Sequence, residues 1–138
     1  MSNDSEEKDS SETRVDRRLA RPRLKEGLIP ADSGIFLRIE VGNEKGRIFD
    51  LSRGGTYLIG RDGADIALDD AKISRKHVEI SLLGPDAYFL RDLASTNGTF
   101  INGKRLQDWS PLRHEDRIRV GDTVLYFAIV EGSIRISR

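Results

Sequence analysis

Residues 33–51 read SGIFLRIEVGNEKGRIFDL, and the fold prediction begins from the pattern of this stretch. Its first half alternates apolar side chains with others: Ile35, Leu37, Ile39 and Val41 share one face, and Phe36, Arg38 and Glu40 the other. A period of two is typical of a β-strand that buries one face. Residues 42–46 combine Gly and Asn as hairpin turns do, and residues 47–51 can return as a second strand. The stretch therefore predicts a pair of β-strands.

Short strand candidates continue along the rest of the chain. Turn signals separate them at residues 54–55, 84–86, 102–103 and 121–122. No apolar stripe with a period of 3.6 residues is long enough for a core helix. Many short strands with regular turns indicate a two-sheet sandwich or a barrel, and we favour the all-β two-sheet sandwich. The further strands are expected at residues 56–61, 65–68, 77–83, 87–93, 99–101, 117–120 and 123–130.

The N-terminal part of the chain has a different composition. Residues 1–12 are mainly acidic, residues 13–25 are mainly basic, and both contain too few apolar residues to bury a face. A chain of 138 residues is long enough for one domain with a core. We therefore expect a flexible, disordered charged tail at residues 1–32 and a single folded domain at residues 33–138.

The overall composition argues against several classes of function. Lysine plus arginine number 23 and aspartate plus glutamate also number 23, so the chain lacks the positive excess of a nucleic-acid-binding protein. Cysteine is absent, which excludes disulfides, thiol catalysis and thiolate metal sites. The polar N-terminus offers no signal peptide or membrane span. We expect a cytoplasmic protein that binds no metal, cofactor, nucleic acid or membrane.

Three short clusters occur in the predicted loops. They are Gly60-Arg61, Ser74-Arg75-Lys76-His77 and Ser95-Thr96-Asn97-Gly98, with Asn102-Gly103 just beyond. In this order and spacing the clusters resemble the forkhead-associated (FHA) domain family, and the similarity runs from about residue 34 to residue 130. The resemblance implies a β-sandwich that binds phosphothreonine peptides in Ser/Thr-kinase signalling and is not an enzyme.

The chemistry of these residue types suits that function. A phosphate ester carries about −1.5 to −2 charges and three acceptor oxygens near neutral pH. The planar fork of Arg61 can bond such oxygens in pairs, and the resemblance places the phosphate on it. Ser74 can add a hydroxyl donor, and Arg75 a further charge. Asn97 has both a donor and an acceptor for the backbone of an extended peptide, and Thr96 is implied to contact the phosphothreonine region.

Other residues of the clusters have supporting roles by resemblance. Gly98 permits a close backbone turn, and His77 is implied to brace the loops through its ring hydrogen bonds. Outside the clusters, Lys72 lies two residues before Ser74 and is a further candidate peptide contact, placed to favour an acidic residue a few positions after the phosphothreonine. The remaining supporting residues are Gly60, Asn102 and Gly103.

Two positions depart from the family pattern. Ala94 stands where glycine is common before Ser95, and Glu115 replaces a glycine often found before Asp116. Neither departure falls on the residues expected at the phosphate, so both bear only on local turn shape.

Thr13 is the only threonine before the folded part, and it begins the sequence Thr13-Arg14-Val15-Asp16. Some bacterial FHA proteins have an N-terminal threonine that a kinase phosphorylates and that their own domain then binds. Thr13 is therefore a candidate phosphorylation site, and its capture benefits from the effective concentration of an on-chain ligand. The expected partners are a Ser/Thr protein kinase and either a phosphothreonine-containing protein or this tail.

Two other functions compete with phosphopeptide binding. Ser74 and His77 could act as nucleophile and base, but the sequence identifies no residue to orient the base and no oxyanion hole. A phosphate-independent interaction scaffold that uses a sheet face or Trp109 is the alternative that stays open.

Overall fold

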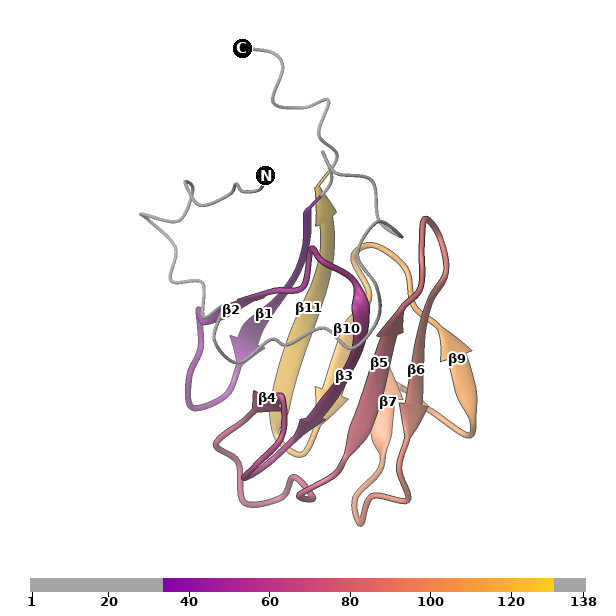
Figure 1. Ribbon diagram of the computed structural model, residues 1–138. Helices are drawn as coiled ribbons and strands as arrows, with labels where there is room; N and C mark the ends of the chain where they lie inside the picture. Colours follow the sequence, from indigo (N-terminus) through magenta and orange to yellow (C-terminus); the bar gives the residue numbers. More distant parts are fainter. Residues whose placement is uncertain (1–33, 131–138) are drawn as a thin grey trace.

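The computed structural model describes residues 34–130, and within them every regular element is a β-strand (Figure 1). A six-stranded sheet has the order β2-β1-β11-β10-β7-β8, and a five-stranded sheet has the order β4-β3-β5-β6-β9. The predicted all-β two-sheet sandwich is therefore confirmed. The expected tail at residues 1–32, including Thr13, lies outside the described residues, as do residues 131–138. The strands are β1 (Gly34–Val41), β2 (Ile48–Asp50), β3 (Gly55–Gly60), β4 (Ile66–Ala67), β5 (Val78–Leu82), β6 (Tyr88–Asp92), β7 (Thr99–Ile101), β8 (Lys104–Arg105), β9 (Trp109–Pro111), β10 (Arg117–Val120) and β11 (Thr123–Val130).

The alternating pattern of β1 behaves as predicted except at its end. Ile35, Leu37 and Ile39 are buried, and the strand pairs with β11 in antiparallel register from Gly34 opposite Val130. Val41 is 52% exposed, because the register of β1 against β11 shifts between Ile39 and Val41. One irregular residue in a strand reverses the face on which the next side chain lies. The expectation that Val41 shares the buried face was therefore wrong.

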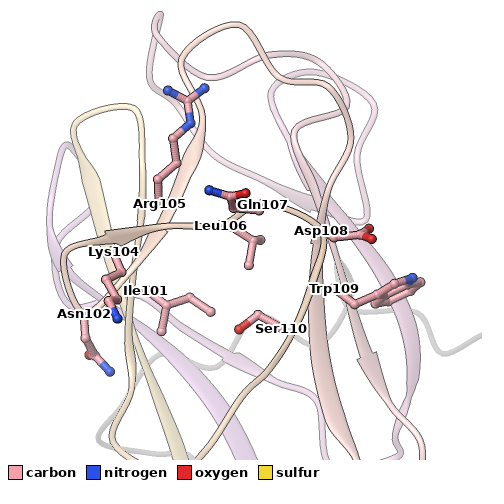
Figure 2. A pocket seen from close by; sticks show the side chains of 9 residues that line it. All are labelled: Ile101, Asn102, Lys104, Arg105, Leu106, Gln107, Asp108, Trp109 and Ser110. Carbon is pink, nitrogen blue, oxygen red and sulfur yellow. The ribbon is translucent and has the colours of Figure 1, made fainter.

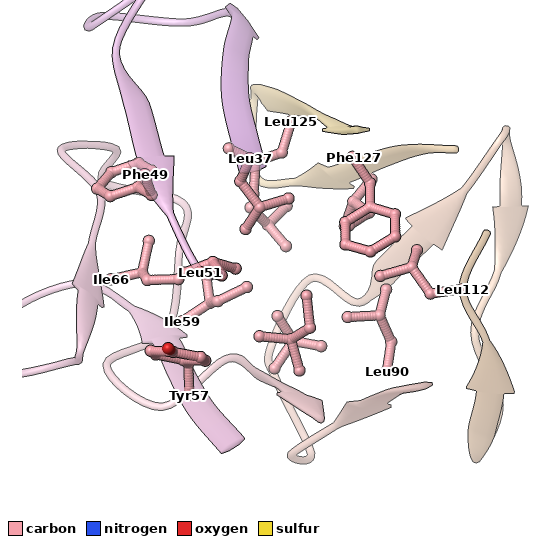
Figure 3. Close-up of a cluster of buried hydrophobic side chains, with 14 of the residues drawn as sticks. Leu37, Phe49, Leu51, Tyr57, Ile59, Ile66, Leu90, Leu112, Leu125 and Phe127 are labelled. Carbon is pink, nitrogen blue, oxygen red and sulfur yellow. The ribbon is translucent and has the colours of Figure 1, made fainter. Parts of the chain in front are cut away.

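The core lies between the two sheets (Figure 3). Tyr88 of the five-stranded sheet and Phe127 of the six-stranded sheet meet edge to face, with ring centroids 5.7 Å apart. Burying each large apolar side chain contributes about 1.5–3 kcal/mol, so the core is a major source of the stability of the sandwich. Fully buried members include Leu37, Phe49, Leu51, Tyr57, Ile59, Ile66, Ile80, Leu82, Leu90, Leu125 and Phe127.

Two strands were not predicted. β8 pairs with β7 at one edge of the six-stranded sheet, and β9 pairs with β6 at an edge of the five-stranded sheet. Neither strand shows an apolar alternation, because both residues of β8 and two of the three residues of β9 are exposed. Pro111 is compatible with β9 because an edge strand needs no second ladder of hydrogen bonds.

The strand register gathers three loops at one end of the sandwich. β5 begins where β3 ends, with Ile59 opposite Val78, and β6 ends there too, with Val78 opposite Asp92. The loops after β3, before β5 and after β6 therefore lie together, at the lower end in Figure 1. β1 begins and β11 ends at the opposite end of the sandwich. Residues 34–130 include no helix with the length and apolar character required to cross a membrane.

Candidate functional site

The loop after β3 and the loop before β5 lie against each other. The N–H of Arg61 donates to the carbonyl oxygen of Ser74 at 3.1 Å. Gly60 permits this approach, since a Cβ at its position would lie 1.8 Å from the carbonyl oxygen of Arg75. No side chain fits in that gap, so Gly60 allows β3 to bring Arg61 beside Ser74.

Ser74 also contacts the loop between β6 and β7. Its Oγ accepts a hydrogen bond from the N–H of Thr96 at 3.0 Å. Ser74 is half-buried, whereas Thr96 is exposed. A hydroxyl that accepts one bond can still donate its own hydrogen, so Ser74 can offer a donor to a ligand at this end of the sandwich.

His77 is fully buried beneath these loops. Its Nδ1 accepts a hydrogen bond from the N–H of Ser74 at 3.0 Å, and its Nε2 lies 2.8 Å from the carbonyl oxygen of Gly98. Because Nδ1 accepts, the ring hydrogen belongs on Nε2, which donates to Gly98. Both ring nitrogens thus bond backbone groups, and the ring forms no hydrogen bond with the Ser74 hydroxyl. This geometry argues against a Ser74–His77 nucleophile and base.

Asn97 lies on the exposed side of the same loop. Its Nδ2 donates to the carbonyl oxygen of Lys72 at 2.8 Å, which connects the β6–β7 loop to the β4–β5 loop. A carboxamide has two donor hydrogens and an acceptor oxygen, so this bond leaves one hydrogen and the oxygen for another partner. Asn97 can therefore bind a peptide backbone while it also fixes the loop.

Asp92 organises the loop that carries Thr96 and Asn97. Its carboxylate accepts the hydroxyl of Ser95 at 2.6 Å, the N–H of Ser95 at 3.0 Å and the hydroxyl of Thr99 at 2.7 Å. Partial burial raises the pKa of Asp92, but these hydrogen bonds outweigh burial and hold the pKa below its ordinary value. The loop is therefore held by an ionised carboxylate.

Asp70 has a similar task in the β4–β5 loop. It accepts the N–H of Lys72 at 2.9 Å, and the N–H of Asp122 and the hydroxyl of Thr123 at 2.8 Å each. Burial raises its pKa, and the three hydrogen bonds together bring the pKa below the ordinary value. Asp70 thereby joins the β4–β5 loop to the turn between β10 and β11.

Sequence reasoning singled out neither of these carboxylates. The signal that could have found them is an aspartate followed within three residues by a residue whose N–H it can accept, as in Asp70 with Lys72 and Asp92 with Ser95. This pattern is common in turns and does not by itself indicate which turns belong to a site.

Arg61 has an unusual polar environment. Its side chain is half-buried, and its Nε is buried without a hydrogen-bond partner among residues 34–130. Leaving a buried donor unpaired costs roughly 1–3 kcal/mol. Lys72, Arg75 and Lys76 lie in the neighbouring loop, where Lys72 and Lys76 are exposed and Arg75 adjoins Ser74. The arrangement favours an anion that would accept the Arg61 donor.

The other predicted residues lie as follows. The Nζ of Lys72 is 3.4 Å from the carboxylate of Asp122, and both side chains are exposed. Asn102 and Gly103 form the turn between β7 and β8, with φ of 50° and 86°. Asn102 bonds the Asp116 carboxylate and the N–H of Arg117 at 2.9 Å each. Asn102 thereby braces that hairpin, and within residues 34–130 no hydrogen bond joins its side chain to the loops of Arg61, Ser74 and Asn97.

A hollow of about 490 Å³ lies between the β7–β8 hairpin and β9 (Figure 2). Leu106 and Ser110 face it, and Trp109 at its side is 49% exposed. Of the residues predicted to form the site, only Asn102 lines this hollow. The convergent loops and the hollow are therefore separate features.

Fold and loops together define a β-sandwich domain with a polar, charged loop surface. The family model of the FHA domain matches residues 57–121. The oxoglutarate dehydrogenase inhibitor of Corynebacterium jeikeium is 34% identical over 108 residues, which cover 78% of this chain and 72% of that protein. This chain belongs to the FHA domain family.

Two further similarities set the extent of this relationship. FHA domain-containing protein FhaA of Mycobacterium tuberculosis is 39% identical over 90 residues, which make up 64% of this chain but only 16% of FhaA. A structure from a structural and functional analysis of phosphothreonine-dependent FHA domain interactions has a TM-score of 0.61 and 33% identity, and covers 69% of this chain and 95% of that one.

Proposed function

We propose that this domain binds phosphothreonine peptides at the loop end of the sandwich, with Arg61, Ser74 and Asn97 as its principal contacts. The observation that carries the proposal is the buried Nε of Arg61, which has no partner among residues 34–130. The guanidinium would turn toward the ligand, so that one phosphate oxygen accepts from this donor and another accepts from a second N–H. Thr96 and Arg75 adjoin this position and are proposed as further contacts.

The surroundings of Ser74 support the same position for the phosphate. Its backbone is fixed by His77 and Arg61, and its Oγ is fixed by Thr96. A donor held in place before binding loses little conformational entropy when the ligand arrives. Asn97 lies one residue from Thr96, so its carboxamide is available to the backbone beside the phosphothreonine.

Lys72 is proposed to select an acidic residue after the phosphothreonine. It starts from an exposed ion pair with Asp122, with 3.4 Å between Nζ and Oδ2. Exposed pairs of this kind contribute about 0–1 kcal/mol, so a carboxylate of the ligand can replace Asp122 at small cost.

The biological setting is proposed to be Ser/Thr-kinase signalling. The relatives include a protein named as an enzyme inhibitor, which supports a regulatory role and not a catalytic one for this domain. The partner is proposed to be a protein phosphorylated on threonine by such a kinase.

Thr13 is proposed as a ligand of its own domain once phosphorylated. The roughly twenty residues between Thr13 and Gly34 can extend to about 70 Å. β1, with 8 residues, is about 27 Å long, so the linker can reach the loop end. Protein phosphorylated at Thr13 should bind a labelled phosphothreonine peptide more weakly than a Thr13→Val variant treated with the same kinase. Equal binding would contradict this capture.

Fluorescence anisotropy with a phosphothreonine peptide library tests the main proposal. Arg61→Ala should lose binding by at least about a hundredfold while the circular dichroism spectrum is kept, because two charge-assisted bonds are removed. Arg61→Lys, which keeps the charge, should recover only part of the affinity because lysine lacks the planar fork. Equal affinity for phosphorylated and plain peptides would instead favour a phosphate-independent scaffold, for which the exposed Trp109 is the candidate contact.

A further inference from the structure

Two arginines flank one aromatic ring beside the loop that carries Asn97. Arg105 of β8 and Arg119 of β10 are the cross-strand neighbours of Phe100 in β7. Their guanidinium carbons lie 5.9 Å and 4.2 Å from the centroid of the Phe100 ring. Both arginines are exposed and the ring is half-buried. We call these three side chains, on the outer face of the six-stranded sheet, the arginine shelf.

The arginine shelf carries two positive charges. Within residues 34–130, neither Arg105 nor Arg119 forms an ion pair, and Arg119 donates instead to the carbonyl oxygen of Gly121 at 3.3 Å. The same sheet face offers a contrast: Arg38 and Arg117 both pair with Glu40, at 3.1 Å and 2.8 Å. Arg38 and Arg117 thus form ion pairs with a carboxylate on this face. Within residues 34–130 the two shelf arginines form none, so they can bind an anion from a ligand.

The shelf borders the proposed peptide site on two sides. A Cβ at Gly98 would lie 3.0 Å from the Arg105 guanidinium, so this group lies against the backbone of the Asn97 loop. Arg105 also lines the hollow, and in Figure 2 its guanidinium lies on the side away from Leu106. On the other side, Arg119 contacts Gly121, which precedes the Asp122 that pairs with Lys72. A segment bound at Asn97 therefore has the shelf next to it.

We propose that the arginine shelf binds carboxylates of acidic residues that flank the phosphothreonine in the same bound segment. This inference rests on the proposed function and assigns the flanking chemistry of its ligand. Contact with the Phe100 ring holds both guanidinium groups on the same patch of the sheet, and a guanidinium can bond a carboxylate through paired hydrogen bonds. The chain itself contains a segment of this chemistry directly before Thr13, with carboxylates at Asp4, Glu6, Glu7, Asp9 and Glu12.

Three labelled phosphothreonine peptides of equal length test the inference by fluorescence anisotropy: one with neutral flanks, one with glutamates on the amino side and one with glutamates on the carboxyl side. The protein should bind one acidic peptide about five- to tenfold more tightly than the neutral peptide, since two exposed ion pairs form. The comparison is made in protein that carries Lys72→Gln, so that the proposed Lys72 contact cannot supply the preference. When Arg105→Gln and Arg119→Gln are added to it, the acidic and neutral peptides should bind with nearly equal affinity. The affinity of this variant for the neutral peptide should change little. Arg38→Gln is the control on the same sheet face and should keep the preference.

The outcomes separate the two proposals. If no phosphopeptide binds to the unaltered protein, the proposed function itself fails. If phosphopeptides bind but flanking glutamates on either side bring no gain, or if the double variant keeps the gain, the shelf inference is overturned while the proposed function stands. If Arg38→Gln also loses the preference for the acidic peptide, the preference comes from the overall positive potential of the sheet face. That result would also overturn the shelf inference. A purely structural role of Arg105 and Arg119 would lower stability without changing the ratio between peptides.

Discussion

Nε2 of His77 lies 2.8 Å from the carbonyl oxygen of Gly98, so one buried ring joins the β5 side of the loop end to the β6–β7 loop. The other ring nitrogen accepts the N–H of Ser74 at 3.0 Å. Two of the three loops that present the proposed contacts are thus tied through a single side chain. Their relative position should depend on His77 although this residue cannot reach a ligand.

Replacing His77 with phenylalanine should keep the volume of the ring and remove both hydrogen bonds. The N–H of Ser74 and the carbonyl of Gly98 would then be buried without partners, and we expect a loss of about 2–4 kcal/mol in the free energy of unfolding. Urea denaturation measures this loss. The exposed His114 supplies the matched control, because His114→Phe removes one exposed hydrogen bond to Ile129 and should cost below about 1 kcal/mol. Similar losses in the two variants would show that the buried ring does not hold the loops.

Gly60 should tolerate no side chain. In Gly60→Ala the new Cβ would lie 1.8 Å from the carbonyl oxygen of Arg75, so the β4–β5 loop must move away from β3. We expect a loss of more than about 2 kcal/mol of stability together with weaker phosphopeptide binding, since Arg61 and Ser74 would separate.

Gly46→Ala is the control for this experiment. Gly46 has a φ of 95°, and a Cβ added there would meet nothing within 4 Å, so alanine adds backbone strain without a clash. It should cost about 1 kcal/mol and leave peptide affinity unchanged. If Gly60→Ala behaves like Gly46→Ala, the close approach of the loops is not required for binding.

Most of the fold could be predicted from the sequence because burial imposes a period of two on the central strands. β1 and β11 pair along their length and bury Leu37 and Phe127 on one face, and such strands show their pattern in the sequence. β8 and β9 carry no such pattern, since residues of an edge strand that face solvent need not alternate. Val41 was misassigned because a register shift is a property of the paired strands and leaves no mark in β1 alone.

Sequence reasoning could name only the proposed ligand contacts of the candidate site. Arg61, Ser74 and Asn97 could be named because their chemistry suits a phosphate and a peptide backbone, and the family resemblance ordered them. Asp70 and Asp92 act through several backbone and hydroxyl donors at once. Such a set forms only after strands far apart in the sequence have paired, so it could not be recognised from local spacing.

Acid should weaken the loop end of the domain through Asp70 and Asp92. The folded state lowers the pKa of both carboxyls, so their stabilising contribution is present above the unfolded pKa of about 3.9. It is lost as the pH falls through the folded values. We expect the free energy of unfolding to change little between about pH 7 and 5 from these groups and to fall below about pH 4.

Urea denaturation across this pH range measures the effect. Asp92→Asn should be less stable at neutral pH and should lose less stability on acidification than the unaltered protein. Asp108→Asn, which removes an exposed carboxylate before β9, supplies the control. A pH profile of Asp92→Asn parallel to that of the unaltered protein would contradict the role of Asp92 in holding the loop.

The two departures from the family pattern should be sites where glycine stabilises the protein. Ala94 has a φ of 57° and Glu115 a φ of 76°, and side chains disfavour this left-handed region. Ala94→Gly should therefore raise the free energy of unfolding by about 0.5–1 kcal/mol. This net gain is the backbone strain that glycine relieves minus the cost of the greater conformational entropy of glycine in the unfolded chain. Glu115→Gly should act in the same direction, since the contact of Glu115 with the Tyr126 hydroxyl is long, at 3.5 Å.

Ala71→Gly is the control, because Ala71 is exposed and is not among the positive-φ residues, so the same exchange should cost about 0.5–1 kcal/mol there. A loss of stability in Ala94→Gly equal to that in Ala71→Gly would show that the turn before Ser95 bears no such strain.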